Sequence, residues 1–264
     1  KVEVQTDEGD AWSEVEEPNQ PATDAKGYYY TTLKEYLERN KDRHENRIFY
    51  ATDEVSQATY IELFKSQGLE VLYMDSFIDT HFIPSLERDY SDVKFSRVDA
   101  DLDDTLLDKE KESEIVDPST NKTRDDEIKE MFEKAINKPR VNVKPQPLKA
   151  ENADTVPPAM VLVPEDARRM QETMALIQQQ DLQFPDDHVL LVNTAHPLIQ
   201  NLLGLSQSTI IGAGGESSPA GALAEMICNQ IYDTALMAQK GFDADGMKAF
   251  VDRSNKLLTK LTER

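Results

Sequence analysis

The sequence predicts an α/β plus α+β chain: a small α/β/α layer followed by a C-terminal domain that ends in two long helices. Three observations support this prediction. Short apolar strands alternate with helices over residues 31–98, which is typical of parallel strands with helices on their faces. Strands are bunched between helices over residues 121–192, which favours an α+β domain with an antiparallel sheet. Two amphipathic helices joined by about two residues then indicate an antiparallel hairpin.

Length and charge limit the classes of partner. At about 150 residues per domain, a chain of 264 residues is expected to form two domains. The formal net charge is −21, which argues against nucleic acid, because such binding needs a positive field, and against anionic membranes. No apolar run approaches the roughly 18 residues of a membrane span. We therefore expect neither nucleic acid nor a membrane as a partner.

The first part of the chain is acidic. Residues 1–24 contain eight acids and one base, so we expect a strand at Val2–Gln5 followed by an acidic loop region that covers residues 1–27. The chain does not begin with Met and carries no signal-peptide pattern, and we suspect part of a longer protein. The single cysteine, Cys228, excludes an internal disulfide and fits a reducing compartment such as the cytoplasm. Its apolar neighbours suggest a buried thiol.

The α/β layer follows. In chain order we expect a helix capped by Thr31-Thr32, the strand Arg47–Ala51, a helix from Asp53 to Gly68, the strand Leu69–Met74, the helix Phe77–Asp89 and the strand Val93–Val98. Threonine suits the start of a helix and glycine suits its end. On the third helix we expect the side chain of Phe82 to be buried.

A linker separates the two predicted domains. Residues 99–118 contain nine acids and two bases, so we place a solvated linker at 109–120, between domains at 1–108 and 121–264. The second domain should contain a three-stranded antiparallel sheet and an amphipathic helix. Its expected elements are a helix over 121–137, a proline-protected edge strand at Arg140–Leu148, strands Ala159–Val163 and His188–Val192, and helices Pro164–Gln179, Pro219–Lys240 and one that begins at Asp243.

The terminal hairpin is a candidate for self-association. Its charges balance, although the chain as a whole is strongly acidic, and a lone helix pair buries too little apolar surface to be stable by itself. A homodimer would complete a four-helix bundle through an isologous contact; the alternative is that the hairpin folds back on its own domain. The candidate dimerisation residues are Leu223, Met226, Ile227, Ile231, Met247, Phe250, Val251, Leu257, Leu258 and Leu261.

A second candidate surface lies on the helix after Pro164. Met170, Met174 and Ile177 follow an i, i+4, i+7 stripe, and Leu176 lies beside it. Such a stripe is compatible with ordinary core packing. It is equally typical of an adaptable apolar surface that accepts varied partners.

Motifs for catalysis or metal binding are weak. Asp99–Glu110 has the acidic spacing of a calcium loop, but Asp104 stands where that loop requires glycine, which favours a solvated linker. The glycine-rich stretch Ile211–Gly221 does not match a nucleotide-binding pattern, which favours a flexible loop. No metal-binding histidine pair or nucleophile elbow occurs. We therefore predict no catalytic, cofactor-binding or metal residue, and no enzyme activity in this chain.

Residues 33–86 resemble a known family. The RIFYATDE turn, the FKSQGLEVLYM helix–glycine–strand and the helix that opens with FID are similar to the end of the middle domain of the heat-shock protein 90 chaperones, in their bacterial HtpG branch. The later order of linker, helix, three strands, Met-bearing helix and terminal hairpin also fits. The resemblance covers nearly all of residues 28–264 and is mainly architectural after residue 120.

The resemblance implies part of an ATP-dependent, homodimeric folding chaperone that binds unfolded client proteins. ATP and Mg would belong to the full-length protein and not to this chain. Dimerisation would use the terminal hairpin, and the chain has no M-E-E-V-D tail for co-chaperones. The implied client-contact residues are His81, Met170, Met174, Leu176 and Ile177, although bacterial relatives often carry Trp at the position of His81. The rival functions are an acidic protein-interaction adaptor without chaperone activity and a calcium-regulated module.

Overall fold

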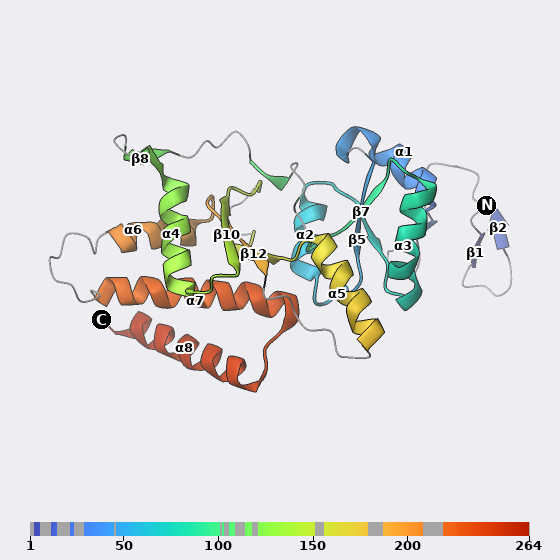
Figure 1. Cartoon of the computed structure of the whole chain (residues 1–264). Helices are drawn as coiled ribbons and strands as arrows, with labels where there is room; N and C mark the ends of the chain where they lie inside the picture. The colour runs from blue at the N-terminus through green and yellow to red at the C-terminus, as the bar shows by residue number, and fades with distance from the viewer. Residues whose placement is uncertain are drawn as a thin grey trace. The chain divides into compact units, whose positions relative to one another are not determined.

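The computed structural model (Figure 1) describes residues 3–5, 12–14, 22–23, 29–44, 46–100, 102, 106–108, 114–117, 121–150, 156–178, 187–207 and 219–263. The chain divides into two compact units, Lys1–Arg47 and Ile48–Arg264. The two units are described separately.

The first unit holds two short strand pairs and one helix. Strands β1 (Glu3–Gln5) and β2 (Trp12–Glu14) pair antiparallel, as do β3 (Ala22–Thr23) and β4 (Tyr29–Tyr30). The strand predicted near residue 2 is therefore present, while β2 and β3 lie where a loop was expected. Helix α1 (Leu33–His44) begins as predicted: the Thr32 hydroxyl accepts from the Glu35 N–H, and the Glu35 carboxylate accepts from the Thr32 N–H at 2.9 Å.

The α/β layer follows the predicted alternation. Its elements are β5 (Arg47–Ala51), α2 (Ala58–Ser66), β6 (Val71–Tyr73), α3 (Phe77–Asp89) and β7 (Lys94–Arg97), and the strand order is β6-β5-β7. Strands β5 and β6 are parallel, as predicted. Gly68 has a φ of +68° just after α2, a conformation that favours glycine. Ser76 and Asp79 form a capping box that fixes the start of α3.

The remaining elements include a second sheet and the helices that follow or flank its strands. They are β8 (Ile115–Asp117), β9 (Lys122–Thr123), α4 (Arg124–Ile136), β10 (Val141–Gln146), β11 (Ala159–Leu162), α5 (Glu165–Gln178), β12 (His188–Asn193), α6 (Pro197–Gln207), α7 (Pro219–Lys240) and α8 (Ala244–Thr262). Helix α6 was not predicted. Asp243 caps α8 by accepting from the Gly246 N–H at 2.8 Å, as its position indicated.

The second sheet is mixed, so the predicted antiparallel arrangement is wrong. The strand order is β10-β12-β11; β12 is parallel to β10 and antiparallel to β11. Between β10 and β12 the chain forms strand β11 and helix α5. Strand β12 then pairs between β10 and β11 and runs parallel to β10. Strand β10 lies at an edge, as predicted, and Pro145 occupies a position on it, where a missing N–H is tolerated.

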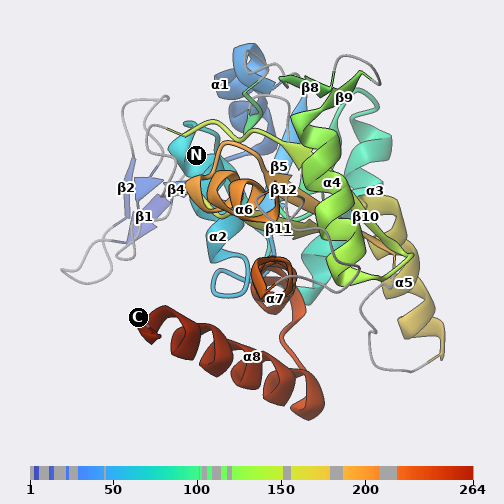
Figure 2. The ribbon, with the colours of Figure 1, turned by 90° about the vertical axis from the view of Figure 1, so that its left-hand side faces the viewer.

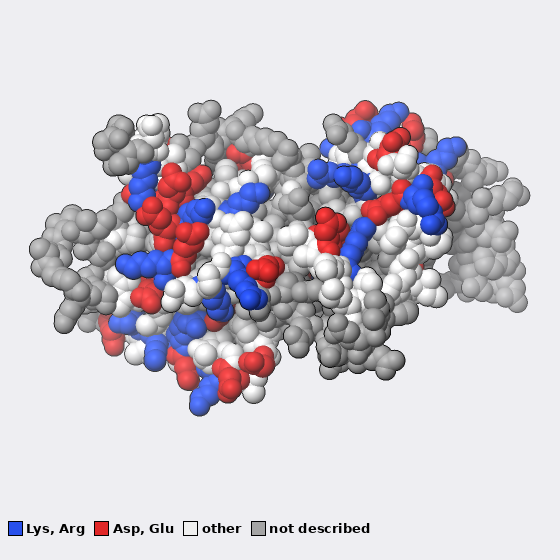
Figure 3. All heavy atoms as spheres, in the orientation of Figure 1, with Lys and Arg blue, Asp and Glu red and all other residues white. Residues whose placement is uncertain are grey.

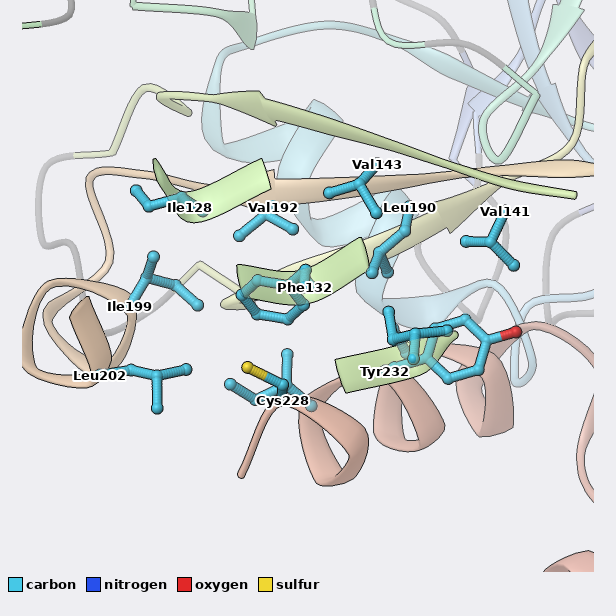
Figure 4. Packing of buried hydrophobic residues seen from close by; sticks show 14 of the residues in the cluster. Ile128, Phe132, Val141, Val143, Leu190, Val192, Ile199, Leu202, Cys228 and Tyr232 are labelled. Atoms are coloured by element: carbon cyan, nitrogen blue, oxygen red, sulfur yellow. The ribbon is translucent and has the colours of Figure 1, made fainter. Parts of the chain in front are cut away.

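One face of this sheet forms the first hydrophobic core. Alternate strand residues such as Val143, Val161 and Leu190 point to helices α4, α6 and α7. In Figure 4, Phe132 of α4 lies between Leu190 and Val192 of the sheet and Cys228 of α7. The burial of Cys228 agrees with the prediction, and it raises the pKa of the thiol to about 12.

The opposite face of the same sheet forms the second core. Met160, Leu162 and Leu191 pack with residues of β5 and α2, including Phe49 and Phe64. The hydroxyl of Tyr60 on α2 donates to the Val161 carbonyl at 2.7 Å, and the Gln239 side-chain amide on α7 donates to the same oxygen at 3.3 Å. The sheet therefore separates two cores: β11 and β12 are covered on both faces, while β10 exposes Asn142 and Lys144 on the second face.

Charged side chains cover the outer edge of β7. The Phe95 N–H donates to Glu87 at 2.9 Å, the Phe95 carbonyl accepts from Arg169 at 3.2 Å, and the Arg97 N–H donates to Glu165 at 3.4 Å. Arg169 also binds Glu87 at 2.8 Å and Glu165 at 2.8 Å. These side chains take the place of a neighbouring strand, and they attach the first turns of α5 to α3 and β7 (Figure 1).

Glu165 is the most heavily bonded carboxylate of this network. It also accepts from the Tyr50 hydroxyl at 2.9 Å and from Arg168 at 2.5 Å. Burial acts to raise the pKa of Glu165, but the attraction of Arg168 and Arg169 outweighs it, so the pKa lies below its ordinary value of 4.5. Burial raises the pKa of Tyr50, which keeps its hydroxyl protonated as a donor.

We expect Phe132→Ala to lower the free energy of unfolding by about 3–5 kcal/mol, because it leaves a cavity in the first core. Urea unfolding measures this loss. Glu133→Ala, on the exposed side of the same helix, should change the free energy by less than about 0.5 kcal/mol. Equal effects of the two changes would contradict the packing described.

We expect Glu165→Gln to cost about 3 kcal/mol at pH 7, because it removes the carboxylate that both Arg168 and Arg169 bind. The folded-state pKa is lowered, so the ionised carboxylate stabilises the fold above the ordinary pKa, and this part is lost as the pH falls through the folded-state pKa. Unfolding measured from pH 7 to pH 3 should therefore show a smaller acid-induced loss in the variant than in the wild type. Glu130→Gln, at an exposed ion pair, should keep the wild-type slope.

Candidate interaction surfaces

Helix α3 exposes an apolar face. Ile78 is 70% exposed and Phe82 is 54% exposed, while Ile83 is buried. His81, predicted as a contact residue, lies exposed between Ile78 and Phe82 in the sequence. The predicted burial of Phe82 is wrong, because Ile83 is the residue that packs in the core, and Phe82, one position earlier and so about 100° round the helix, faces outward. The i, i+4 spacing of Ile78 and Phe82 was the sequence signal for this face.

Helix α5 presents its methionines. Met170 is 59% exposed and Met174 is 45% exposed, so the predicted stripe is a surface and not core packing at these two positions. The side chains of Leu176 and Ile177 lie outside the described residues. Among the side chains of α5 that the structure describes, the buried or half-buried ones are Ala167 and the charged Glu165, Arg168 and Arg169. Ion pairs therefore attach the first turns of the helix, and Met170 and Met174 stay exposed.

Helix α8 lies at the margin of the structure against α7 (Figures 1 and 2). Gln230 donates to Ser254 at 2.9 Å, and Arg253 binds Asp233 at 2.5 Å. No residue of α8 is buried. The apolar residues left exposed on this helix are Met247, Val251, Leu258 and Leu261; they lie within about a quarter turn of one another on the helix and form an uncovered stripe.

The other predicted dimerisation residues are more covered. Ile231 belongs to the first core, and Ile227 packs against that core. Leu223 and Met226 on α7, and Phe250 and Leu257 on α8, are half-buried, and the Phe250 ring lies 5.6 Å from that of Phe242. The structure thus separates residues that hold the hairpin to its own chain from residues that remain uncovered.

Helices α4 and α8 differ in the charge that they display. In Figure 3 acidic side chains gather over α4, whose first turn contains Asp125, Asp126 and Glu127, whereas α8 displays both signs. An uncovered apolar stripe with balanced charge can meet a copy of itself without the repulsion expected from the net charge of −21.

The candidate calcium loop is described only in part, and its first acid is engaged with other side chains. Asp99 is buried and binds Arg97 at 2.5 Å and the Gln57 side-chain amide at 2.8 Å, so it supports the turn after β5. Most of the remaining calcium-loop acids and residues 211–218 lie outside the described residues. Among the residues described, no group of three His, Cys, Asp or Glu could hold a metal ion, so no site for Mg is identified there. None of the described helices is long and apolar enough to cross a membrane.

Comparisons with known proteins identify the family of this chain. Residues 21–263 match the family model described as Hsp90 protein. The chaperone protein htpG of Bacteroides fragilis strain YCH46 is 35% identical over 191 residues, covering 69% of this chain and 27% of the relative. HtpG of Bacteroides thetaiotaomicron is 32% identical over 188 residues, with the same coverage. HtpG of Wolbachia pipientis wMel is 28% identical over 238 residues, covering 88% of this chain and 35% of the relative.

The chain spans about a quarter to a third of the length of these curated relatives. The family model nevertheless matches most of the chain, from the end of the acidic N-terminal region to the last turn of α8. The chain therefore belongs to the Hsp90 family and is related to the bacterial HtpG chaperones.

Proposed function

We propose that this chain supplies the homodimerisation and client-binding parts of an ATP-dependent folding chaperone. The observation that carries the proposal is the pair of exposed apolar faces on α3 and α5. Both helices are attached to a well-packed core. Exposed apolar side chains of this kind mark interaction sites. Methionine adapts to partners of different shape, which suits unfolded client proteins of varied sequence.

The proposed client contacts are His81, Met170, Met174, Leu176 and Ile177, to which we add Ile78 and Phe82. The last two residues are exposed apolar neighbours of His81 on α3, and they supply the apolar area that histidine lacks. Each contact would be weak, and two protomers acting together would strengthen binding.

The proposed dimer joins the terminal hairpins of two copies in a four-helix bundle. The uncovered stripe of α8 supports this proposal, because its apolar residues gain little within their own chain. Leu223 and Met226 of α7, half-buried in one copy, would complete the contact. A symmetric pairing of this kind presents the same patch from both subunits.

Nucleotide chemistry is proposed for a part of the protein outside residues 1–264, because the aligned stretches cover only 27% to 35% of the relatives. ATP and Mg would bind there, and the present chain would respond to that cycle without catalysing it. The single buried cysteine agrees with a reducing compartment, and we propose a cytoplasmic location.

We expect Leu258→Glu to convert a dimer into a monomer at tens of micromolar, because it puts a charge into the proposed apolar contact without a partner. Multi-angle light scattering measures the mass directly. Thr259→Glu adds the same charge on the neighbouring exposed position, about 100° away from Leu258, and should leave the dimer intact. A wild-type chain that is monomeric in this range would refute the proposed bundle.

We expect the double change Met170→Ala and Met174→Ala to reduce protection of heat-denatured citrate synthase from aggregation by at least about half, because it removes apolar contact area from α5. Light scattering at 360 nm follows the aggregation. Val55→Ala is the matched control, since Val55 is 87% exposed but lies in the turn before α2. A wild-type chain that gives no protection would favour the acidic adaptor without chaperone activity.

A further inference from the structure

Arg169 is the residue at which α3, α5 and the β7 edge meet. Its Nη1 and Nη2 atoms donate to the two Glu87 oxygens on α3 at 2.8 Å and 3.2 Å. Its Nε atom donates to Glu165 on its own helix at 2.8 Å, and Nη2 also donates to the Phe95 carbonyl at 3.2 Å. One planar guanidinium group therefore fixes three structural elements at once, with a geometry that a flexible ammonium group cannot reproduce.

The neighbouring residues on both helices carry the exposed apolar faces. Met170 follows Arg169 directly on α5, and Phe82 lies just over one turn before Glu87 on α3. Views from two sides place α5 beside α3 (Figures 1 and 2). On each helix the exposed apolar side chain lies about 140° from the ion-pairing one, Phe82 from Glu87 and Met174 from Arg169. The ion pair thus joins the two helices while both apolar faces remain exposed.

We propose that Arg169 is a positioning residue that holds the apolar faces of α3 and α5 at a fixed spacing, so that one client segment contacts both. This inference rests on the proposed client binding. With fixed spacing, the second contact becomes intramolecular once the first has formed. The gain in affinity then depends on how well the two faces are held in place. Without Arg169 the two faces bind as independent patches.

The network can set the orientation of α5 as well as stabilise the fold. The charges of Glu87, Glu165, Arg168 and Arg169 cancel, so the group brings no net field to the surface. Its bonds go to the first turns of α5, where Glu165, Arg168 and Arg169 are buried or half-buried. The exposed part of α5 at Met174 depends on this anchor for its direction.

The test is a double-mutant cycle on client binding, with the full 264-residue chain and fluorescein-labelled, reduced and carboxymethylated lactalbumin as the unfolded probe. Fluorescence anisotropy gives the Kd of the wild type, Phe82→Ala, Met174→Ala and the double variant, each with Arg169 and with Arg169→Gln. With Arg169 present, the double loss should differ from the product of the single losses by about tenfold. With Arg169→Gln, this difference should fall to about twofold or less. A structural role alone would shift all Kd values without removing the coupling.

Two further variants keep the test decisive. Glu87→Gln breaks the α3 side of the network and leaves Glu165 with both arginines, so it should remove the coupling even where Arg169→Gln fails to fold. Arg124→Gln removes the same charge at a half-exposed position on α4 and should preserve the coupling. Amide hydrogen exchange should be faster at Phe95 and Arg97 in Glu87→Gln and Arg169→Gln. These N–H groups donate to Glu87 and Glu165, and each variant either removes one of these carboxylates or removes the arginine that holds them.

The outcomes separate this inference from the proposed function. Single variants that weaken binding, together with a coupling that persists in both Arg169→Gln and Glu87→Gln, overturn the positioning role and leave client binding intact. If neither Phe82→Ala nor Met174→Ala raises the Kd, the client-contact proposal fails and the positioning role fails with it.

Discussion

Strands β11 and β12 are covered on both faces, whereas β10 is buried on one face only, and the arrangement of residues 48–264 depends on this constraint. A sheet buried on both faces needs a helical layer on one side and the α/β layer on the other, so neither part can be removed without exposing apolar strand residues. Polar groups at its edge must also find partners in the interior. The Val161 carbonyl finds two, Tyr60 from one layer and Gln239 from the other. The two cores therefore share a single sheet.

This arrangement explains where exposed apolar surface remains. Helices α4, α6 and α7 are committed to the first core, and α2 is committed to the second. Helix α8 contributes no buried residue, and α5 is held by ion pairs. The exposed apolar side chains of these two helices, such as Met174 and Leu258, thus contribute little to the stability of the single chain. They remain available for the contacts proposed above, so a well-packed chain can still expose apolar surface.

Elements with strong local signals could be predicted from the sequence, whereas long-range pairing could not. The bounds of α3 and α7 match the prediction, because Ser76 caps one helix and prolines and glycines delimit the other. Helix α6 was missed although Pro197 occupies its first position and His196 Nδ1 accepts from the Leu198 N–H at 3.0 Å, because its short apolar run follows β12 after only three residues. The direction of β10 relative to β12 could not be predicted either, because it depends on which strand occupies the centre of the sheet.

The sequence by itself determined the family, the alternation of strands and helices over residues 31–98, and the amphipathic character of α5 and α8, because caps, periodicity and the RIFYATDE turn are local features. Only the tertiary structure decided which apolar residues are free. Phe82 and Ile83 are adjacent and both apolar, yet one faces solvent and the other the core. Ile231 and Leu258 belong to similar stripes, yet only Leu258 is uncovered. Exposure depends on what packs opposite a helix, and that partner lies far away in the sequence.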